Sequence, residues 1–183
     1  NISPGEVGLL ITAFTLPGVF LTLFLGVLAD RIGRKVIIIP SLFLFGIAGT
    51  ACFFVTSFTH LVALRFLQGT GAAALGVLNT TLVGDLFSGR DRTAVMGVNS
   101  SVLSIGTASY PAIGGLLATF AWNYPFILPI LAIPIGLFVM ARLHNPEPKS
   151  DEHFKEYLAN AFASIRNRRA MVLFAASLMT FII

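Results

Sequence analysis

The chain carries, at residues 7–29, the uncharged stretch VGLLITAFTLPGVFLTLFLGVLA and, directly after it at residues 30–35, the charged stretch DRIGRK. An α-helix needs roughly 20 apolar residues to cross a bilayer core of about 30 Å, so the first stretch is long enough to span a membrane. The second stretch is polar and contains a glycine, which is typical of a short turn at the membrane surface. Together they predict a transmembrane helix followed by a reversal into a second one.

Apolar segments of similar length recur along the whole chain, separated by short clusters of charge. With 56% hydrophobic and 11% charged residues among its 183, a water-soluble domain would lack the charge that its surface elements need. We predict an all-α, polytopic transmembrane helix bundle with five complete spans and a sixth that the chain end cuts short. These spans are residues 7–29, 36–58, 61–87, 94–120, 124–143 and 170–183.

The basic residues lie almost entirely on one side of the predicted spans. All but one of the 12 Lys and Arg residues fall in or beside the loops at residues 30–35, 88–93 and 144–169, and the loops on the other side carry none. The positive-inside rule places the basic loops in the cytoplasm. We expect a multi-pass protein of the plasma membrane, the inner membrane in a bacterium, with the lipid bilayer around it. No nucleic-acid partner is expected, because the basic residues share no soluble face and form no recognised motif.

The segment at residues 146–169 separates the fifth span from the sixth. Two prolines, Pro146 and Pro148, end the fifth helix because proline lacks a backbone donor. Beyond them, apolar residues recur every three or four positions and predict an amphipathic helix on the inner membrane surface. The alternative is a partly ordered charged connector. The stripe consists of Phe154, Leu158, Phe162 and Ile165.

The turn after the first span has a recognisable pattern of glycine, acid and base, made up of Gly26, Asp30, Arg31, Gly33, Arg34 and Lys35. This pattern resembles the signature loop between helices 2 and 3 of the major facilitator superfamily. Gly33 permits a tight reversal, and Gly26 permits a close helix approach. Asp30 at a helix C-terminus opposes the helix dipole, so it needs a partner such as Arg34 or the N-terminus of another helix. The resemblance implies a conformational switch against the other lobe; the alternative is a solvated turn.

The third span contains Arg65, Gln68 and Gly69, which resemble the family's helix 4 motif. Arg65 lies roughly 7 Å below the outer boundary at about 1.5 Å per residue. In one interpretation it faces the central cavity, where its charge lowers the pKa of a nearby acid and couples protonation to transport. In the other it extends outward to the interface. The spans hold no acid at this depth, and related exporters often carry one in helix 1.

An inner charge cluster is expected where the third span ends. Asp85 and Asp30 fall at the same membrane level in this topology, and Arg92 follows in the same loop as Asp85. The resemblance implies that these charges form a network with the basic residues of the first turn. Sequence alone does not pair them, and a solvated loop at Asp85 is the alternative.

The fourth span repeats small residues at fixed spacing, at Gly97, Gly106, Pro111, Gly114 and Gly115. This resembles the helix 5 motif of proton-coupled antiporters in the same family. Pro111 removes a backbone donor and predicts a kink, and the glycines allow a neighbour to pack closely. Tyr110 departs from the family's glycine before proline, which puts the tightness of the kink in question. An ordinary small-residue packing face is the alternative.

The resemblance covers nearly the whole chain and identifies the spans as helices 2–6 and the start of helix 7 of a twelve-helix transporter. It implies an N-terminal lobe at residues 1–145 without helix 1, a cytoplasmic linker at 146–169, and the first part of the C-terminal lobe at 170–183. We predict proton-coupled export of small amphipathic or drug-like molecules by alternating access, with protons, substrate and the C-terminal lobe as partners. The alternatives are nutrient uptake by symport or facilitation, and a non-transporting receptor or scaffold.

Residues for enzymatic or metal chemistry are not evident in the sequence. The lone Cys52 has no cysteine partner, and the three His residues lie in or near loops without a Ser, His and Asp set. No nucleotide-binding loop is present. We therefore expect no enzyme activity, no cofactor and no metal. Polar residues within the spans can line a cavity or bond a neighbouring helix; these are Asn79, Thr80, Asn99, Ser101 and Ser104.

Overall fold

The computed structural model describes residues 4–143. Over these residues every element is a helix, and no strand occurs, so the predicted all-α fold class is confirmed. The linker at 146–169, its amphipathic helix and the segment at 170–183 lie outside the described residues. The elements are α1 (Pro4–Ile32), α2 (Arg34–Ala51), α3 (Phe58–Leu86), α4 (Gly89–Phe120), the 3₁₀-helix η1 (Tyr124–Leu131) and α5 (Ala132–Arg142).

Five segments of this part of the chain are long and apolar enough to cross a membrane, with η1 and α5 together forming the fifth. The second predicted span is too long, because α2 ends at Ala51 rather than at residue 58. After it the backbone tightens into i→i+3 bonds, in which Phe53 donates to Thr50 over 3.0 Å. The carbonyl of Phe53 then accepts a hydrogen bond of 3.1 Å from the side chain of Asn123. That bond replaces the helical partner that the carbonyl has lost.

The fifth predicted span, residues 124–143, is one helix by sequence but two in the structure. Pro125 and Pro129 lie four residues apart in η1, so Pro129 cannot donate to the carbonyl that an α-helix would offer it. The segment adopts the tighter 3₁₀ winding instead, in which residues three apart share a face. The α-helical pattern resumes in α5 at Ala132.

Two predicted loops are shorter than expected. Gly33 is the one residue between α1 and α2, and its φ of 99° is a backbone conformation that favours glycine. The loop at residues 88–93 shrinks to Phe87 and Ser88, because α4 already begins at Gly89. Charged residues continue these helices beyond the apolar segments, since a helix does not need to stop where it leaves lipid.

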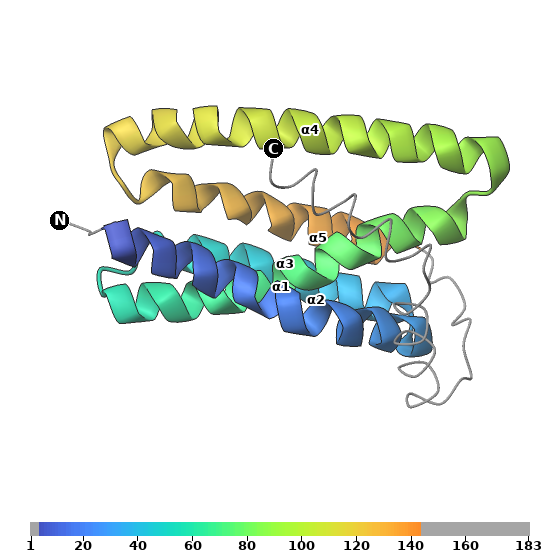
Figure 1. The fold of residues 1–183 in the computed structure, drawn as a ribbon, viewed down its shortest axis with the longest axis horizontal. Helices are drawn as coiled ribbons and strands as arrows, with labels where there is room; N and C mark the ends of the chain where they lie inside the picture. Colours follow the sequence, from blue (N-terminus) through green and yellow to red (C-terminus); the bar gives the residue numbers. More distant parts are fainter. Residues whose placement is uncertain (1–3, 144–183) are drawn as a thin grey trace, which may run out of the picture. The chain divides into compact units, whose positions relative to one another are not determined.

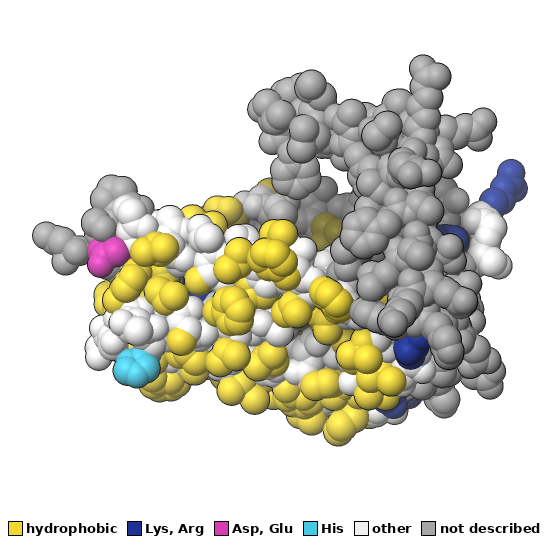
Figure 2. All heavy atoms as spheres, turned by 60° about the horizontal axis from the view of Figure 1, so that its bottom comes forward, with side chains coloured by type: hydrophobic (Ala, Val, Ile, Leu, Met, Phe, Trp, Pro, Cys, Tyr) yellow, Lys and Arg dark blue, Asp and Glu magenta, His cyan; other side chains and the backbone are white. Residues whose placement is uncertain are grey.

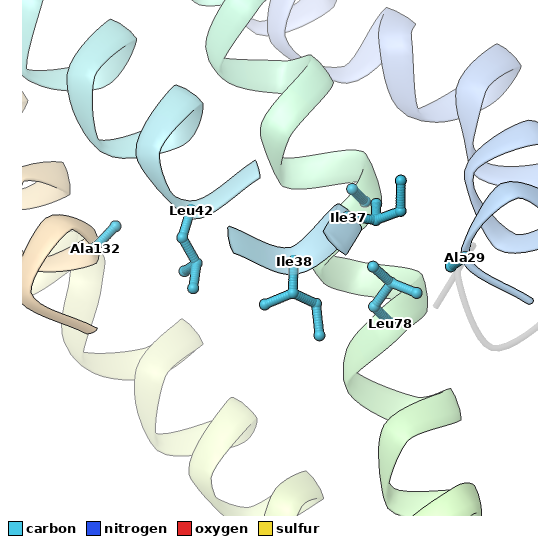
Figure 3. Packing of buried hydrophobic residues seen from close by; sticks show 7 residues of the cluster. Ala29, Ile37, Ile38, Leu42, Leu78 and Ala132 are labelled. Atoms are coloured by element: carbon cyan, nitrogen blue, oxygen red, sulfur yellow. The ribbon is translucent and has the colours of Figure 1, made fainter. Parts of the chain in front are cut away.

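The helices α1 and α2 both pack against α3, and η1 and α5 pack against α2. Buried side chains from α1, α2, α3 and α5 meet in one cluster (Figure 3). In contrast, α4 contributes no buried residue and lies beside η1 and the end of α3 (Figure 1). The cluster comprises Ala29, Ile37, Ile38, Leu42, Ala74, Leu78 and Ala132.

Large apolar side chains cover much of the described surface. Val19 is 70% exposed and Phe20 is 63% exposed, on a helix with no charge over residues 7–29. Figure 2 shows apolar side chains across the middle of one face, with most of the visible Lys and Arg side chains at one end. Such a surface is unfavourable in water at about 25 cal/mol per Å², whereas lipid solvates it. The distribution matches a chain whose solvent is a bilayer.

Candidate functional site

Arg34 joins three helices at the basic end of the bundle. It opens α2, and its side chain is only 10% exposed. The guanidinium forms an ion pair with Asp30 of α1 and, through Nε, a 2.8 Å bond to Oδ2 of Asp85 in α3. The planar guanidinium offers several donors in a fixed fork, which suits two carboxylates at once. We call Asp30, Arg34 and Asp85 the Arg34 cluster.

The Arg34 cluster compensates two carboxylates that lie in unfavourable positions. Asp30 and Asp85 both lie near helix C-termini, where the dipole disfavours a negative charge. The expected Asp30–Arg34 pair is confirmed, and Arg34 also supplies the partner of Asp85. Arg92 was expected to join this network, and the structure places its guanidinium against Gly84, where a Cβ would lie 3.1 Å from it. Of the other residues in the turn motif, Arg31 lies in the last turn of α1 and Lys35 follows Arg34 in α2. A Cβ at Gly26 would lie 3.6 Å from Val77, which is an ordinary contact distance.

The second site surrounds Arg65, which lies in the first third of α3. Its Nη1 donates a 3.0 Å hydrogen bond to Oε1 of Gln68, one turn further along the helix. The guanidinium carbon lies 4.6 Å from the ring centroid of Phe126 in η1 and 5.8 Å from that of Phe14 in α1. Both distances fall within the range of cation–π attraction. We call Arg65, Gln68, Phe14 and Phe126 the Arg65 site.

Two glycines let the surrounding helices come this close. A Cβ at Gly69 would collide with the backbone carbonyl of Phe14, so a larger residue would not allow α1 to approach α3 this closely at that point. A Cβ at Gly49 of α2 would lie 2.5 Å from both Nε2 of Gln68 and Cβ of Pro129. Gln68 is consequently 2% exposed. The residues of the helix 4 motif therefore have local structural roles: Gly69 allows α1 to approach α3, and Gln68 orients Arg65.

Arg65 is one of the residues that line a cavity beside α1. The cavity has a volume of about 240 Å³ and is otherwise lined by apolar side chains of one face of α1. An arginine held in apolar surroundings is costly unless its environment stabilises the charge, which makes a functional role the default interpretation. The lining residues are Val7, Leu10, Ile11, Phe14 and Arg65.

The small residues of α4 have no packing neighbour among the described residues. A Cβ added at any of the four motif glycines would meet no atom within 4 Å, and Tyr110 is 58% exposed. Pro111 lies inside a helix that continues to Phe120. The neighbour that the small-residue spacing predicts is therefore not part of residues 4–143. The glycines are Gly97, Gly106, Gly114 and Gly115.

One pair of the polar residues within the spans is now accounted for. Nδ2 of Asn79 in α3 donates to Oδ1 of Asn99 in α4 over 3.0 Å, so these side chains bond neighbouring helices. Sequence reasoning missed Phe14 and Phe126, because an aromatic residue in an apolar span carries no signal of its own. The one available signal was the Pro125 and Pro129 pair, which predicts an irregular turn next to Phe126.

The fold and these sites define a class of protein: a multi-pass α-helical membrane protein with charged side chains held inside its helix bundle. The family described as Major Facilitator Superfamily matches residues 1–183, and the chain belongs to this family.

Curated relatives cover most of this chain. The chain is 31% identical over 133 residues to the bacillibactin exporter of Bacillus subtilis, and this alignment covers 69% of this chain and 33% of the relative. It is 28% identical over 132 residues to the multidrug transporter protein MdtP of the same organism, covering 72% and 24%. It is 27% identical over 158 residues to the quinolone resistance protein NorA of Staphylococcus aureus, covering 85% and 40%. The chain thus spans about a quarter to two fifths of the length of these relatives.

Proposed function

We propose that this chain is part of a transporter that exports small amphipathic or drug-like molecules in exchange for protons. The observation that carries the proposal is the Arg65 site, where a cation is held at a cavity by two ring faces and a buried glutamine. A fixed positive charge at that place favours the ionised form of an acid brought near it. The acid then binds a proton more readily when it lies away from Arg65 than when it lies beside it, so proton binding depends on the conformation around the cavity.

The direction of transport is inferred from the relatives and from α4. Three of the relatives are named an exporter, a multidrug transporter and a quinolone resistance protein. The glycine and proline spacing of α4 resembles the motif of proton-coupled antiporters, and its open face among residues 4–143 is available to a further helix. Both observations favour export.

The Arg34 cluster is the proposed conformational switch. It ties the inner ends of α1, α2 and α3 together, and Nη1 of Arg34 is buried without a hydrogen-bond partner among the described residues. In this proposal residues 1–145 belong to the N-terminal lobe, 146–169 form the linker and 170–183 begin the C-terminal lobe. Contact with that lobe alternates as the two lobes rock around the substrate.

Transport in everted membrane vesicles of the full-length protein tests this function, with ethidium and norfloxacin as probes. We expect a proton gradient to drive accumulation of a probe and a protonophore to abolish it. Arg65→Gln should remove the gradient-driven component, whereas Arg90→Gln at the exposed start of α4 should retain it. Accumulation that persists unchanged after the gradient is collapsed would contradict proton coupling.

Nutrient uptake is the second candidate function. The chain is 28% identical over 160 residues to the riboflavin transporter RibZ of Clostridioides difficile, whose name specifies a vitamin rather than a drug. Accumulation of labelled riboflavin in intact cells, dependent on the full-length protein, would favour uptake over export.

A further inference from the structure

We propose that Phe126 and Phe14 are positioning residues for Arg65, with Phe126 acting as the principal one. Their ring faces hold the guanidinium beside the cavity and leave its charge unneutralised. The proposal rests on the proposed function, because it concerns how the coupling cation is kept in place.

The winding of η1 places Phe126 in register with Arg65. Phe126 and Pro129 are three residues apart, so in a 3₁₀-helix their side chains share a face. Arg65 and Gln68 are also three residues apart, on the facing side of α3. Pro129 lies against Gly49 beside Gln68, while the Phe126 ring lies 4.6 Å from the guanidinium carbon. The proline fixes one end of the turn, and the ring therefore meets the arginine at the other.

Phe14 reaches the same cation from the opposite helix. Gly69 brings the α1 backbone at Phe14 against α3, one turn beyond Arg65. The Phe14 ring is 5.8 Å from the guanidinium carbon, farther than that of Phe126. A weaker attraction is expected at that distance.

The two aromatic contacts of Arg65 have a property that an ion pair would lack. Among residues 4–143 no carboxylate forms a salt bridge with Arg65, and its hydrogen-bond partner is the neutral amide of Gln68. An aromatic face attracts a cation through its quadrupole without cancelling the charge. Arg65 is thereby held in one orientation while its full charge stays available to an acid or a substrate that enters the cavity.

A double-mutant cycle on the purified full-length protein tests the contact without any substrate. Arg65→Met, Phe126→Leu and the double variant are compared by thermal unfolding in detergent. We expect the double variant to lower Tm by less than the sum of the two single changes, because the shared interaction is lost only once. Additive shifts would overturn the assignment. As a control, Arg65→Met with Phe138→Leu should be additive, since Phe138 is 66% exposed on α5.

Transport in proteoliposomes separates positioning from a general packing role. For Phe126→Leu we expect gradient-driven transport of ethidium or norfloxacin to fall roughly tenfold, while energy-independent counterflow exchange stays within about twofold. Phe126→Tyr keeps the ring face and should restore driven transport. Phe14→Leu should show a smaller loss of the same kind, and Phe138→Leu should show none.

The outcomes distinguish this inference from the proposed function. If the wild-type protein shows no gradient-driven transport of the probes, the proposed function is wrong and the positioning role falls with it. If the wild-type protein is driven by the gradient but Phe126→Leu behaves like Phe138→Leu, the inference alone is overturned. The same holds if Phe126→Tyr is as defective as Phe126→Leu.

Discussion

The helices α1, α2 and α3 and the helix α4 all contain segments apolar enough to cross a membrane, but they differ in how closely they are packed. Glycines of the first three helices bring backbones together, and Arg34 and Arg65 contact side chains of other helices. In α4 no residue is buried, and the motif glycines meet nothing among residues 4–143. The comparison teaches that small residues in membrane helices are not equivalent: in α3 they complete contacts within the bundle, and in α4 they leave a face that meets no neighbour among residues 4–143.

The largest expected effect is at the Arg34 cluster, in the packed group. Arg34→Met leaves the carboxylates of Asp30 and Asp85 facing each other at side-chain exposures of 23% and 13%. Removing one partner of a buried ion pair costs about 4 kcal/mol, so we expect a loss of that order in thermal unfolding of the full-length protein. Arg90→Met, on the exposed start of α4, should change stability by less than about 0.5 kcal/mol. Equal losses of stability for the two variants would show that the difference in burial has no effect on the stability cost.

A methyl group on the glycines tests the packing difference directly. Gly69→Ala places a Cβ against the Phe14 carbonyl and should cost about 3 kcal/mol, despite the helix preference of alanine. Gly106→Ala meets no neighbour among the described residues and should cost little in thermal unfolding. A loss at Gly106 as large as at Gly69 would show that another segment covers α4 in the full-length protein.

A side-chain link joins the two regions at Asn79 and Asn99. Asn79→Leu removes a donor that bonds α4 and leaves the Asn99 amide without that partner, which should cost about 1 kcal/mol. Changing both residues to Leu should recover part of the loss, because no polar group is then left unsatisfied. Thermal unfolding of the two single variants and the double variant measures this. A double variant that loses the full sum would exclude the hydrogen bond as the link.

The smallest effect is expected at the turn after α2. Asn123→Ala removes the donor to the Phe53 carbonyl and should cost about 0.5–1 kcal/mol, because water at the bilayer surface can replace part of the bond. Thr119→Ala is a matched control, since its hydroxyl bonds a carbonyl of its own helix. A larger loss at Thr119 than at Asn123 would show that the Asn123 bond does not stabilise the end of α2.

The apolar spans and their charged ends were predictable, because lipid requires long helices and the turn motif supplies a known spacing. The end of α2 was not, since residues 52–58 are apolar enough to continue the span, and the bond that the Phe53 carbonyl accepts comes from Asn123, 70 positions further along the chain. Pro125 and Pro129 predict an irregularity near η1, but proline alone does not determine whether a helix kinks or changes to 3₁₀ winding.

The candidate sites divide in the same way. The Asp30–Arg34 pair follows from adjacency along the chain, so sequence could name it. The bond from Arg34 to Asp85 joins residues 51 positions apart, and the ring of Phe126 reaches Arg65 from another helix. Such contacts depend on how helices are placed against one another, which periodicity within one helix does not encode.

Gly33 has a mechanical consequence for α1 and α2. With one residue between them, two backbone torsions set the angle of the pair, and the Arg34–Asp30 bridge spans that same joint. This one-residue connection cannot absorb a movement of either helix, so a tilt of α1 must turn α2 with it. A single inserted residue at this corner would rotate α2 by about 100°, since an α-helix has 3.6 residues per turn, and would carry Arg34 away from both carboxylates.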